Sequence, residues 1–214
     1  VSADDLQAIE FKDTTREATG SLIFELAGVL GVTPNAHAAQ ALFAAIATDT
    51  GWFRFSATSS ETYRVIGELV RCGAVPATIY RELYEQGTLA RVHLAGRILS
   101  RVKLEENGML AYTSVGLDDF AETGALPSDT EDLVNECLKI AGTQAAFIAI
   151  EQANKQVKVS FRSRNDVNVA TIAERFNGGG HRQAAGATLP GPLTQAVAQA
   201  LTVMKEQLSA VRLT

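Results

Sequence analysis

The sequence is short of the side chains that most metal and redox sites use. It has two cysteines and three histidines among 214 residues. Cys72 and Cys137 are far apart and form no CxxC pair, which argues against a disulfide framework or a zinc ribbon and fits a reducing, cytoplasmic setting. Because His37, His93 and His181 are the only imidazoles, the chain does not predict a self-contained His-rich metal site. We expect both thiols, His37 and His93 to be structural or solvated.

Long apolar runs and an excess of positive charge are also lacking. No apolar run approaches the roughly 18 residues of a membrane span, so no membrane partner is expected. Residues 1–10 have neither the basic nor the apolar region of a signal peptide, and there is no initiator Met. The net charge of −5 argues against long duplex DNA, whose binding depends on many phosphate contacts. It leaves open a short nucleotide held by a few donors and a metal.

The first 87 residues predict closely spaced helices. Capping residues, prolines and glycine stops bound these helices at about 14–31, 33–47, 58–73 and 76–87. Ala36–Ala47 is apolar almost all the way round, which is typical of a helix buried on several sides. Trp52–Phe55 predicts a strand or an extended turn. Thr88 caps a further helix to about residue 101, which we interpret as a connector.

Residues 102–214 predict a lobe of mixed helix and strand. Asn107–Gly108 indicates a hairpin within 102–115, and 145–152 and 156–164 predict a second pair of strands. Capping signals predict helices over 128–140, 168–176 and 192–211, with a glycine loop over 177–181. The pattern is that of an α+β domain.

Two places carry residues suited to chemistry. The first is Asp49, which follows a buried apolar helix and precedes Thr50 and Gly51. A carboxylate there could bind a hard cation or a phosphate-bound metal. The local sequence favours the alternative, in which Asp49 accepts hydrogen bonds from the Thr50 and Gly51 amides as an Asx-turn.

The second place is the run Asn177–Ala187, NGGGHRQAAGA. A helix stop needs one glycine, whereas Gly178, Gly179 and Gly180 allow close approach of a ligand and an anion nest. His181 adds a donor that can carry charge, and Arg162 and Arg164 share a face of the preceding strand. The alternative is a mobile surface loop with solvated arginines, which the combination of motifs disfavours.

Three segments together resemble a known family. In type and order they resemble motifs of the DHH-family phosphoesterases. The segments are ATDTGWFRF (Ala47–Phe55), FRSR (Phe161–Arg164) and FNGGGHRQAAGA (Phe176–Ala187). The resemblance is strongest to the oligoribonucleases (nanoRNases) that also act on 3′-phosphoadenosine 5′-phosphate. It covers essentially the whole chain.

The resemblance implies an α/β fold of two lobes. Residues 1–87 would be the C-terminal, mostly helical remainder of a parallel-sheet DHH domain, 88–101 a connector helix, and 102–214 a DHH-associated α+β domain with a mixed sheet. It further implies a hydrolase with two divalent ions, of the manganese type, for which Asp49 is a catalytic residue and metal ligand. Arg162, Ser163, Gly178, Gly179, Gly180 and His181 would bind the short RNA or nucleotide.

The chain departs from the family in lacking the DHH triplet and the upstream aspartates. Residues 1–8 resemble the segment on the C-terminal side of that triplet. We therefore expect about a hundred residues of the family pattern to precede them, and this fragment alone to be inactive. Alternatives are a cyclic-dinucleotide phosphodiesterase, a polyphosphatase and a non-catalytic nucleotide-binding module. The sequence leaves open whether the protein forms a homodimer.

Overall fold

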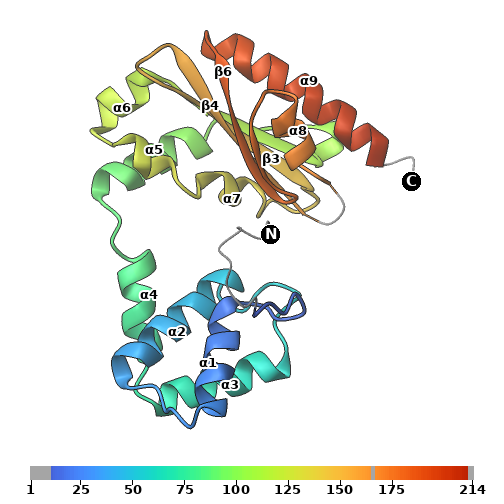
Figure 1. Ribbon diagram of the computed structural model, residues 1–214. Coiled ribbons are helices and arrows are strands. Elements are labelled where there is room, and N and C mark those ends of the chain that lie inside the picture. Colours follow the sequence, from blue (N-terminus) through green and yellow to red (C-terminus); the bar gives the residue numbers. More distant parts are fainter. Residues whose placement is uncertain (1–10, 165–166, 212–214) are drawn as a thin grey trace. The chain divides into compact units, whose positions relative to one another are not determined.

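The computed structural model describes residues 11–164 and 167–211, in two compact units, Val1–Gln86 and Gly87–Thr214 (Figure 1). Each unit has its own hydrophobic core. The first ten residues, including those that resemble the sequence after a DHH triplet, lie outside the described residues. No helix of the described part is long and apolar enough to cross a membrane.

The regular secondary structure of the first unit is helical throughout its described residues. Its helices are α1 (Thr19–Val29), α2 (Ala36–Asp49), α3 (Ser60–Arg71) and α4 (Pro76–Tyr84). Helix α3 begins at the Ser59–Thr62 capping box, one residue later than the expected pattern, and ends where the sequence predicts. Asn35, rather than Thr33, caps α2 by accepting a hydrogen bond from the Ala38 amide at 2.9 Å.

Helix α2 differs from expectation in its burial. Its fully buried residues are Ala39, Phe43, Ile46 and Ala47, which lie on one stripe of the helix. Phe43 and Ile46 pack with residues of α3 and α4. The other faces are half-buried or exposed, so the prediction of burial on several sides is wrong within the described structure.

The second unit is built on a six-stranded mixed sheet. Its strands are β1 (Lys103–Glu105), β2 (Leu110–Val115), β3 (Ala145–Glu151), β4 (Gln156–Ser163), β5 (Gly179–His181) and β6 (Ala184–Pro190). The order is β1-β2-β3-β4-β6-β5, and β2 with β3 is the parallel pair. The α+β lobe with a mixed sheet is thereby confirmed. The segment predicted as a glycine loop is largely strand β5, paired antiparallel with β6.

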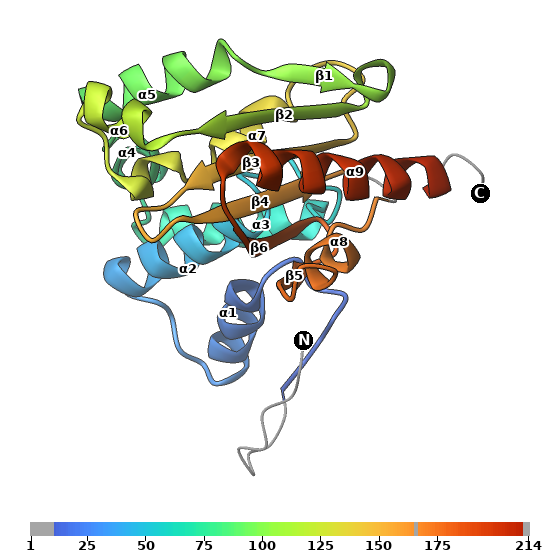
Figure 2. The same cartoon turned by 90° about the horizontal axis from the view of Figure 1, so that it is seen from above.

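Helices cover both faces of this sheet (Figure 2). Helices α8 (Ala170–Glu174) and α9 (Leu193–Val211) pack on one face, over a core that includes Phe147, Phe161 and Met204. Helices α5 (Leu89–Leu99) and α7 (Leu133–Cys137) pack on the other face, against β2 and β3. The expected helix 128–140 is divided into a 3₁₀ turn (Pro127–Thr130) and α7, because Asp132 adopts a left-handed conformation with φ 65°.

An ion-pair network fastens α5 to the short helix α6 (Leu117–Thr123). The Asp119 carboxylate is buried and accepts hydrogen bonds from Arg97 Nε and an Arg101 guanidinium nitrogen, each at 2.6 Å. The Gly116 amide donates a third at 2.8 Å. Burial opposes ionisation of Asp119, but these donors outweigh it and hold the pKa of the carboxyl below its ordinary value.

Candidate functional site

Asp49 is the last residue of α2, and its side chain is exposed. The Thr50 amide donates to the Ile46 carbonyl at 3.1 Å, and the Gly51 amide donates to the Thr48 carbonyl at 3.0 Å. Both amides required for an Asx-turn are therefore engaged elsewhere, and the Asx-turn interpretation is wrong. Within the described structure the Asp49 carboxylate receives no hydrogen bond. It stands at the C-terminal end of α2, and its side chain is accessible.

Thr50 shapes the chain immediately after Asp49. Its side chain is fully buried, and Oγ1 donates to the Ile46 carbonyl at 2.7 Å while accepting from the Phe53 amide at 3.1 Å. Gly51, Trp52 and Phe53 then take left-handed φ values of 56°, 58° and 64°. Residues 52–55 are therefore a tight turn and not the strand or extended turn that the sequence predicts. Such a run is unfavourable for aromatic residues, so the contacts around it must hold it in place.

Aromatic packing supplies that support. The Trp52 and Phe53 rings each lie 6.0 Å from the Phe43 ring, edge to face. Trp52 also meets Tyr80 of α4, with ring centres 4.9 Å apart. The end of α2, from which the Asp49 side chain projects, is therefore packed against the core of the first unit.

Asp49 has no companions suited to a metal centre within the described structure. Among residues 11–164 and 167–211, no group of three or more histidine, cysteine, aspartate or glutamate side chains could hold an ion. A two-ion centre needs several carboxylate and imidazole ligands. The described residues thus supply one candidate ligand and do not fit a complete two-metal site by themselves.

The second candidate region is an open half of the sheet in the second unit. The core beneath α5 and α7 includes β2 and β3 but no residue of β4 or β6. On that face Lys158, Ser160 and Arg162 of β4 remain exposed or half-buried. So do their register partners Thr188, Gly186 and Ala184 of β6. This open face, as we call these six residues together with β5, is free to accept a ligand.

Register brings two predicted residues onto the open face. Arg162 pairs with Ala184, and Ala184 pairs with His181. Directly opposed residues of antiparallel strands point to the same face, so the arginine and the histidine flank a small alanine. Two strand spacings separate them, about 10 Å. No described residue hydrogen-bonds to the His181 ring, and Arg162 donates to the Phe161 carbonyl.

Charge on this region contrasts with the rest of the chain. Residues 152–164 and 175–192 contain no aspartate or glutamate, although the chain as a whole carries −5. The same two segments contain Lys158, Arg162 and His181. A basic surface with small residues between its cations suits a phosphate-bearing ligand.

The three glycines of the motif have different structural roles. A Cβ on Gly178 would lie 2.2 Å from the Gly186 carbonyl oxygen, and one on Gly180 would lie 2.5 Å from the Ala184 carbonyl oxygen. Both positions need glycine so that β5 can pack against β6. A Cβ on Gly179 would meet nothing within 4 Å. Close packing therefore explains why glycine stands at positions 178 and 180. It does not explain Gly179, which faces open space.

Ser163 contacts the chain rather than open space. It is 6% exposed, and its hydroxyl donates to the Val167 carbonyl at 2.6 Å. Its amide donates to the Gln183 carbonyl at 3.1 Å. Ser163 thereby holds the turn between β5 and β6, next to His181. Its direct contact with substrate stays a prediction.

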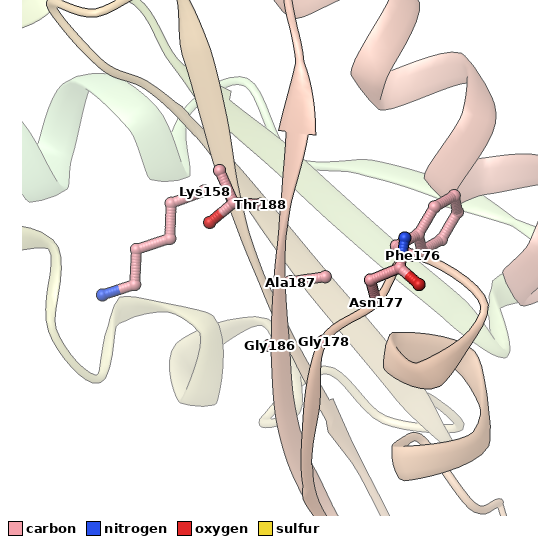
Figure 3. Close-up of a pocket in the computed structure, with 7 residues that line it drawn as sticks. All are labelled: Lys158, Phe176, Asn177, Gly178, Gly186, Ala187 and Thr188. Atoms are coloured by element: carbon pink, nitrogen blue, oxygen red, sulfur yellow. The ribbon is translucent and has the colours of Figure 1, made fainter.

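A hollow of about 410 Å³ opens beside the glycine strand (Figure 3). It is lined by Lys158, Phe176, Asn177, Gly178, Gly186, Ala187 and Thr188. Beyond Gly186 the edge of β6 has no strand partner in the described structure, because the pairing with β5 stops there. Sequence reasoning did not place Lys158 or Thr188 in a site, whereas Asn177 opens the run that it singled out. The strand alternation that exposes Lys158 with Arg162 was the available signal.

An α+β unit with an open sheet face free of acidic residues is suited to an anionic ligand, and comparison with known proteins identifies its family. Residues 107–210 match the DHHA1 domain. The bifunctional oligoribonuclease and PAP phosphatase NrnA of Thermus thermophilus is 34% identical over 198 residues, covering 92% of this chain and 59% of the relative. The protein of the same name from Bacillus subtilis is 33% identical over 180 residues, covering 83% of this chain and 56% of the relative.

A solved structure agrees with these relatives. An exopolyphosphatase-related protein of Bacteroides fragilis superposes with a TM-score of 0.93 at 25% identity, covering 99% of this chain and 63% of that one. The chain belongs to the DHH family of phosphoesterases, of the nanoRNase type. It spans less than two thirds of the length of these relatives.

Proposed function

We propose that this chain is part of a hydrolase that cleaves phosphoesters in short oligoribonucleotides, in 3′-phosphoadenosine 5′-phosphate, or in both. The observation that carries the proposal is the open face, where Arg162 and His181 flank Ala184 on an acid-free surface. Membership of the DHH family and the names of the two NrnA relatives support it. The enzyme would act in the cytoplasm, as the sparse cysteines suggest.

The open face would hold the phosphate of the substrate. The Arg162 guanidinium can donate two parallel hydrogen bonds to phosphate oxygens, and His181 can donate one more. The open space at Gly179 would let a phosphate or ribose approach the backbone amides closely. Ser163 would keep His181 in position through the β5–β6 turn.

Membership of this phosphoesterase family implies that the activity depends on a divalent metal ion. We propose two ions, with manganese as the metal and Asp49 as one of several ligands. The remaining ligands are not among the described residues, which would contribute the Asp49 carboxylate at the end of α2. For the same reason we expect the 214-residue chain alone to release no mononucleotide from short RNA.

The experiment is a turnover assay on the complete product of the gene with manganese. Substrates are di- to pentaribonucleotides and 3′-phosphoadenosine 5′-phosphate, with a cyclic dinucleotide and polyphosphate as comparison substrates. Asp49→Asn should lower kcat at least about 100-fold, since changes even to groups behind a metal ligand cost 10- to 100-fold. Glu85→Gln is the matched control, an exposed carboxylate just after α4.

His181→Ala separates binding from chemistry. Loss of a hydrogen bond to a phosphate should raise KM about 10-fold or more and leave the affinity for manganese unchanged. Equal kinetics in His181→Ala and the unmodified enzyme would contradict the assignment of the open face. Turnover of the cyclic dinucleotide alone, or of polyphosphate alone, would show that the proposed substrates are wrong and that the enzyme is a cyclic-dinucleotide phosphodiesterase or a polyphosphatase. Nucleotide binding without any turnover would favour a non-catalytic module.

A further inference from the structure

A second group of donors lies on the open face, away from Arg162 and His181. Lys158 of β4 and Thr188 of β6 are register partners, so both side chains project from the same face of the sheet. Both are exposed, and within the described part of the chain neither the ammonium group nor the hydroxyl has a hydrogen-bond or ion-pair partner. In Figure 3 the Lys158 side chain extends away from the sheet beside Thr188.

The charge of Lys158 is not neutralised by its surroundings. Lys139 forms an ion pair with Glu136 at 2.7 Å, and Lys205 forms one with Glu105 at 2.9 Å. By contrast, the segments around Lys158, residues 152–164 and 175–192, contain no aspartate or glutamate. A cation without a carboxylate partner, next to a hydroxyl that can donate, is suited to bind a phosphate.

The strands set the distance between the two groups of donors. Lys158 is four residues from Arg162 along β4, and its partner Thr188 is four residues from Ala184 along β6. At 3.3 Å per residue, this separation is about 13 Å. The two groups are therefore too far apart to contact one phosphate from the same backbone positions.

Only small residues lie between the two groups. The intervening row of the open face is Ser160, Gly186 and Gly179, which are register partners across β4, β6 and β5. The hollow of about 410 Å³ begins at this row, since Gly186, Lys158 and Thr188 are among its lining residues. An extended ligand can therefore pass from one group of donors to the other without displacing a large side chain.

This separation distinguishes the two proposed substrates. Six single bonds join successive phosphorus atoms of RNA, and six also join the two phosphorus atoms of 3′-phosphoadenosine 5′-phosphate. An extended chain advances about 1.2 Å per bond, so six bonds reach about 7 Å and twelve bonds reach about 14 Å. The separation thus fits phosphates two nucleotide steps apart, and it exceeds the span of a single nucleotide.

From these observations we infer that Lys158 and Thr188 form a second phosphate subsite, which selects oligoribonucleotides over 3′-phosphoadenosine 5′-phosphate. The inference rests on the proposed function. One phosphate of an oligoribonucleotide contacts Arg162 and His181, and the phosphate two steps away accepts hydrogen bonds from Lys158 and Thr188. The single nucleotide occupies the first subsite alone.

The test compares ligands of one base that differ in the spacing of their phosphates, using the complete gene product. They are 3′-phosphoadenosine 5′-phosphate, 5′-phosphorylated diadenylate, whose phosphates are also one step apart, and 5′-phosphorylated triadenylate, whose outer phosphates are two steps apart. The variants are Lys158→Gln and Lys158→Arg. Lys103→Gln is the matched control, because Lys103 is an exposed lysine of β1, at the other end of the strand order.

Dissociation constants are measured by calorimetry at several salt concentrations in EDTA, which prevents cleavage, and turnover is measured separately with manganese. The unmodified protein should bind the triadenylate about 10-fold more tightly than the diadenylate, as expected for one charge-assisted hydrogen bond. Lys158→Gln should remove this gain. It should also reduce the slope of log affinity against log salt for the triadenylate by about 0.7, the value for one phosphate contact on a single strand. Lys158→Arg and Lys103→Gln should retain both the gain and the slope.

Two results would overturn the inference and leave the proposed function to the turnover assay. One is unaltered binding of the triadenylate by Lys158→Gln. The other is an equal loss of affinity for all three ligands, which would mean that Lys158 reaches the first phosphate. The expected binding without turnover would support the subsite and overturn the hydrolase proposal. If the three ligands are neither bound nor cleaved, both proposals are wrong.

Discussion

Two neighbouring glycines, Gly178 just before β5 and Gly179 at its start, should respond in opposite ways to the same substitution. Gly178→Ala places a Cβ 2.2 Å from the Gly186 carbonyl oxygen and 2.7 Å from the Ala187 Cβ. These are parts of β6 that cannot rotate away, so β5 must move off the sheet. Overpacking of this kind costs about 1–3 kcal/mol. Gly179→Ala meets no heavy atom within 4 Å, and its φ lies outside the left-handed range.

Gly179→Ala should therefore leave the second unit as stable as before or more stable by up to about 1 kcal/mol, because alanine restricts the unfolded chain. Its methyl group would instead occupy the space through which a phosphate approaches the backbone. We expect about 10-fold weaker binding of adenosine 3′,5′-bisphosphate, comparable to the loss of one charge-assisted hydrogen bond. One substitution thus perturbs stability and the other perturbs ligand binding.

The assay is urea unfolding followed by far-ultraviolet circular dichroism, with calorimetry for binding. Trp52 is the only tryptophan and lies in the first unit, so its fluorescence reports that unit separately and should not change in either variant. Unaltered unfolding of Gly178→Ala would refute the packing explanation. Unaltered binding by a folded Gly179→Ala would refute the close approach of ligand to β5.

Two further predictions concern stability. Because the folded pKa of Asp119 is lowered, its contribution to stability is present above the unfolded pKa of about 3.9 and is lost as the pH falls through the lower folded value. Urea unfolding of Asp119→Asn should show a smaller loss of stability below about pH 4 than the unmodified protein, and an equal loss would contradict this. Thr50→Val removes the bonds of Oγ1 to Ile46 and Phe53 and should destabilise the first unit by about 1–3 kcal/mol, measured by Trp52 fluorescence. Thr50→Ser should recover most of that loss, and no recovery would show that the hydroxyl is not responsible.

Elements with a regular pattern could be predicted from the sequence. The alternation of Val157, Val159 and Phe161 with polar residues predicted β4 correctly. Successive residues of a strand point to opposite faces, so the apolar residues mark the buried face and the polar residues the other. Strand β5 could not be predicted, since three residues carry no periodicity and their conformation depends on β6. The turn at Trp52 was missed because aromatic residues usually favour extended backbone, and Thr50 overrides that preference.

The candidate site was predictable in its residue types but not in its arrangement. The motifs singled out Arg162 and His181, which are 19 positions apart in the chain, without showing that both border Ala184. That relation follows from the register of β4, β6 and β5, which is a tertiary property. Lys158 and Thr188 were not predicted, because they come together in the hollow only through the pairing of β4 with β6.

The acid-free face also limits which anions can approach. Lys158 and Arg164 are six positions apart, so the basic stretch is about 20 Å long. Salt screens the electrostatic interaction between exposed charges, with a Debye length of about 8 Å at physiological ionic strength. A ligand no longer than the stretch experiences mainly local attraction. A long polyanion extends over the surrounding protein, whose excess of acidic residues repels it. We therefore propose that the uneven distribution of charge favours short anionic ligands over long ones, and that added salt would weaken this preference.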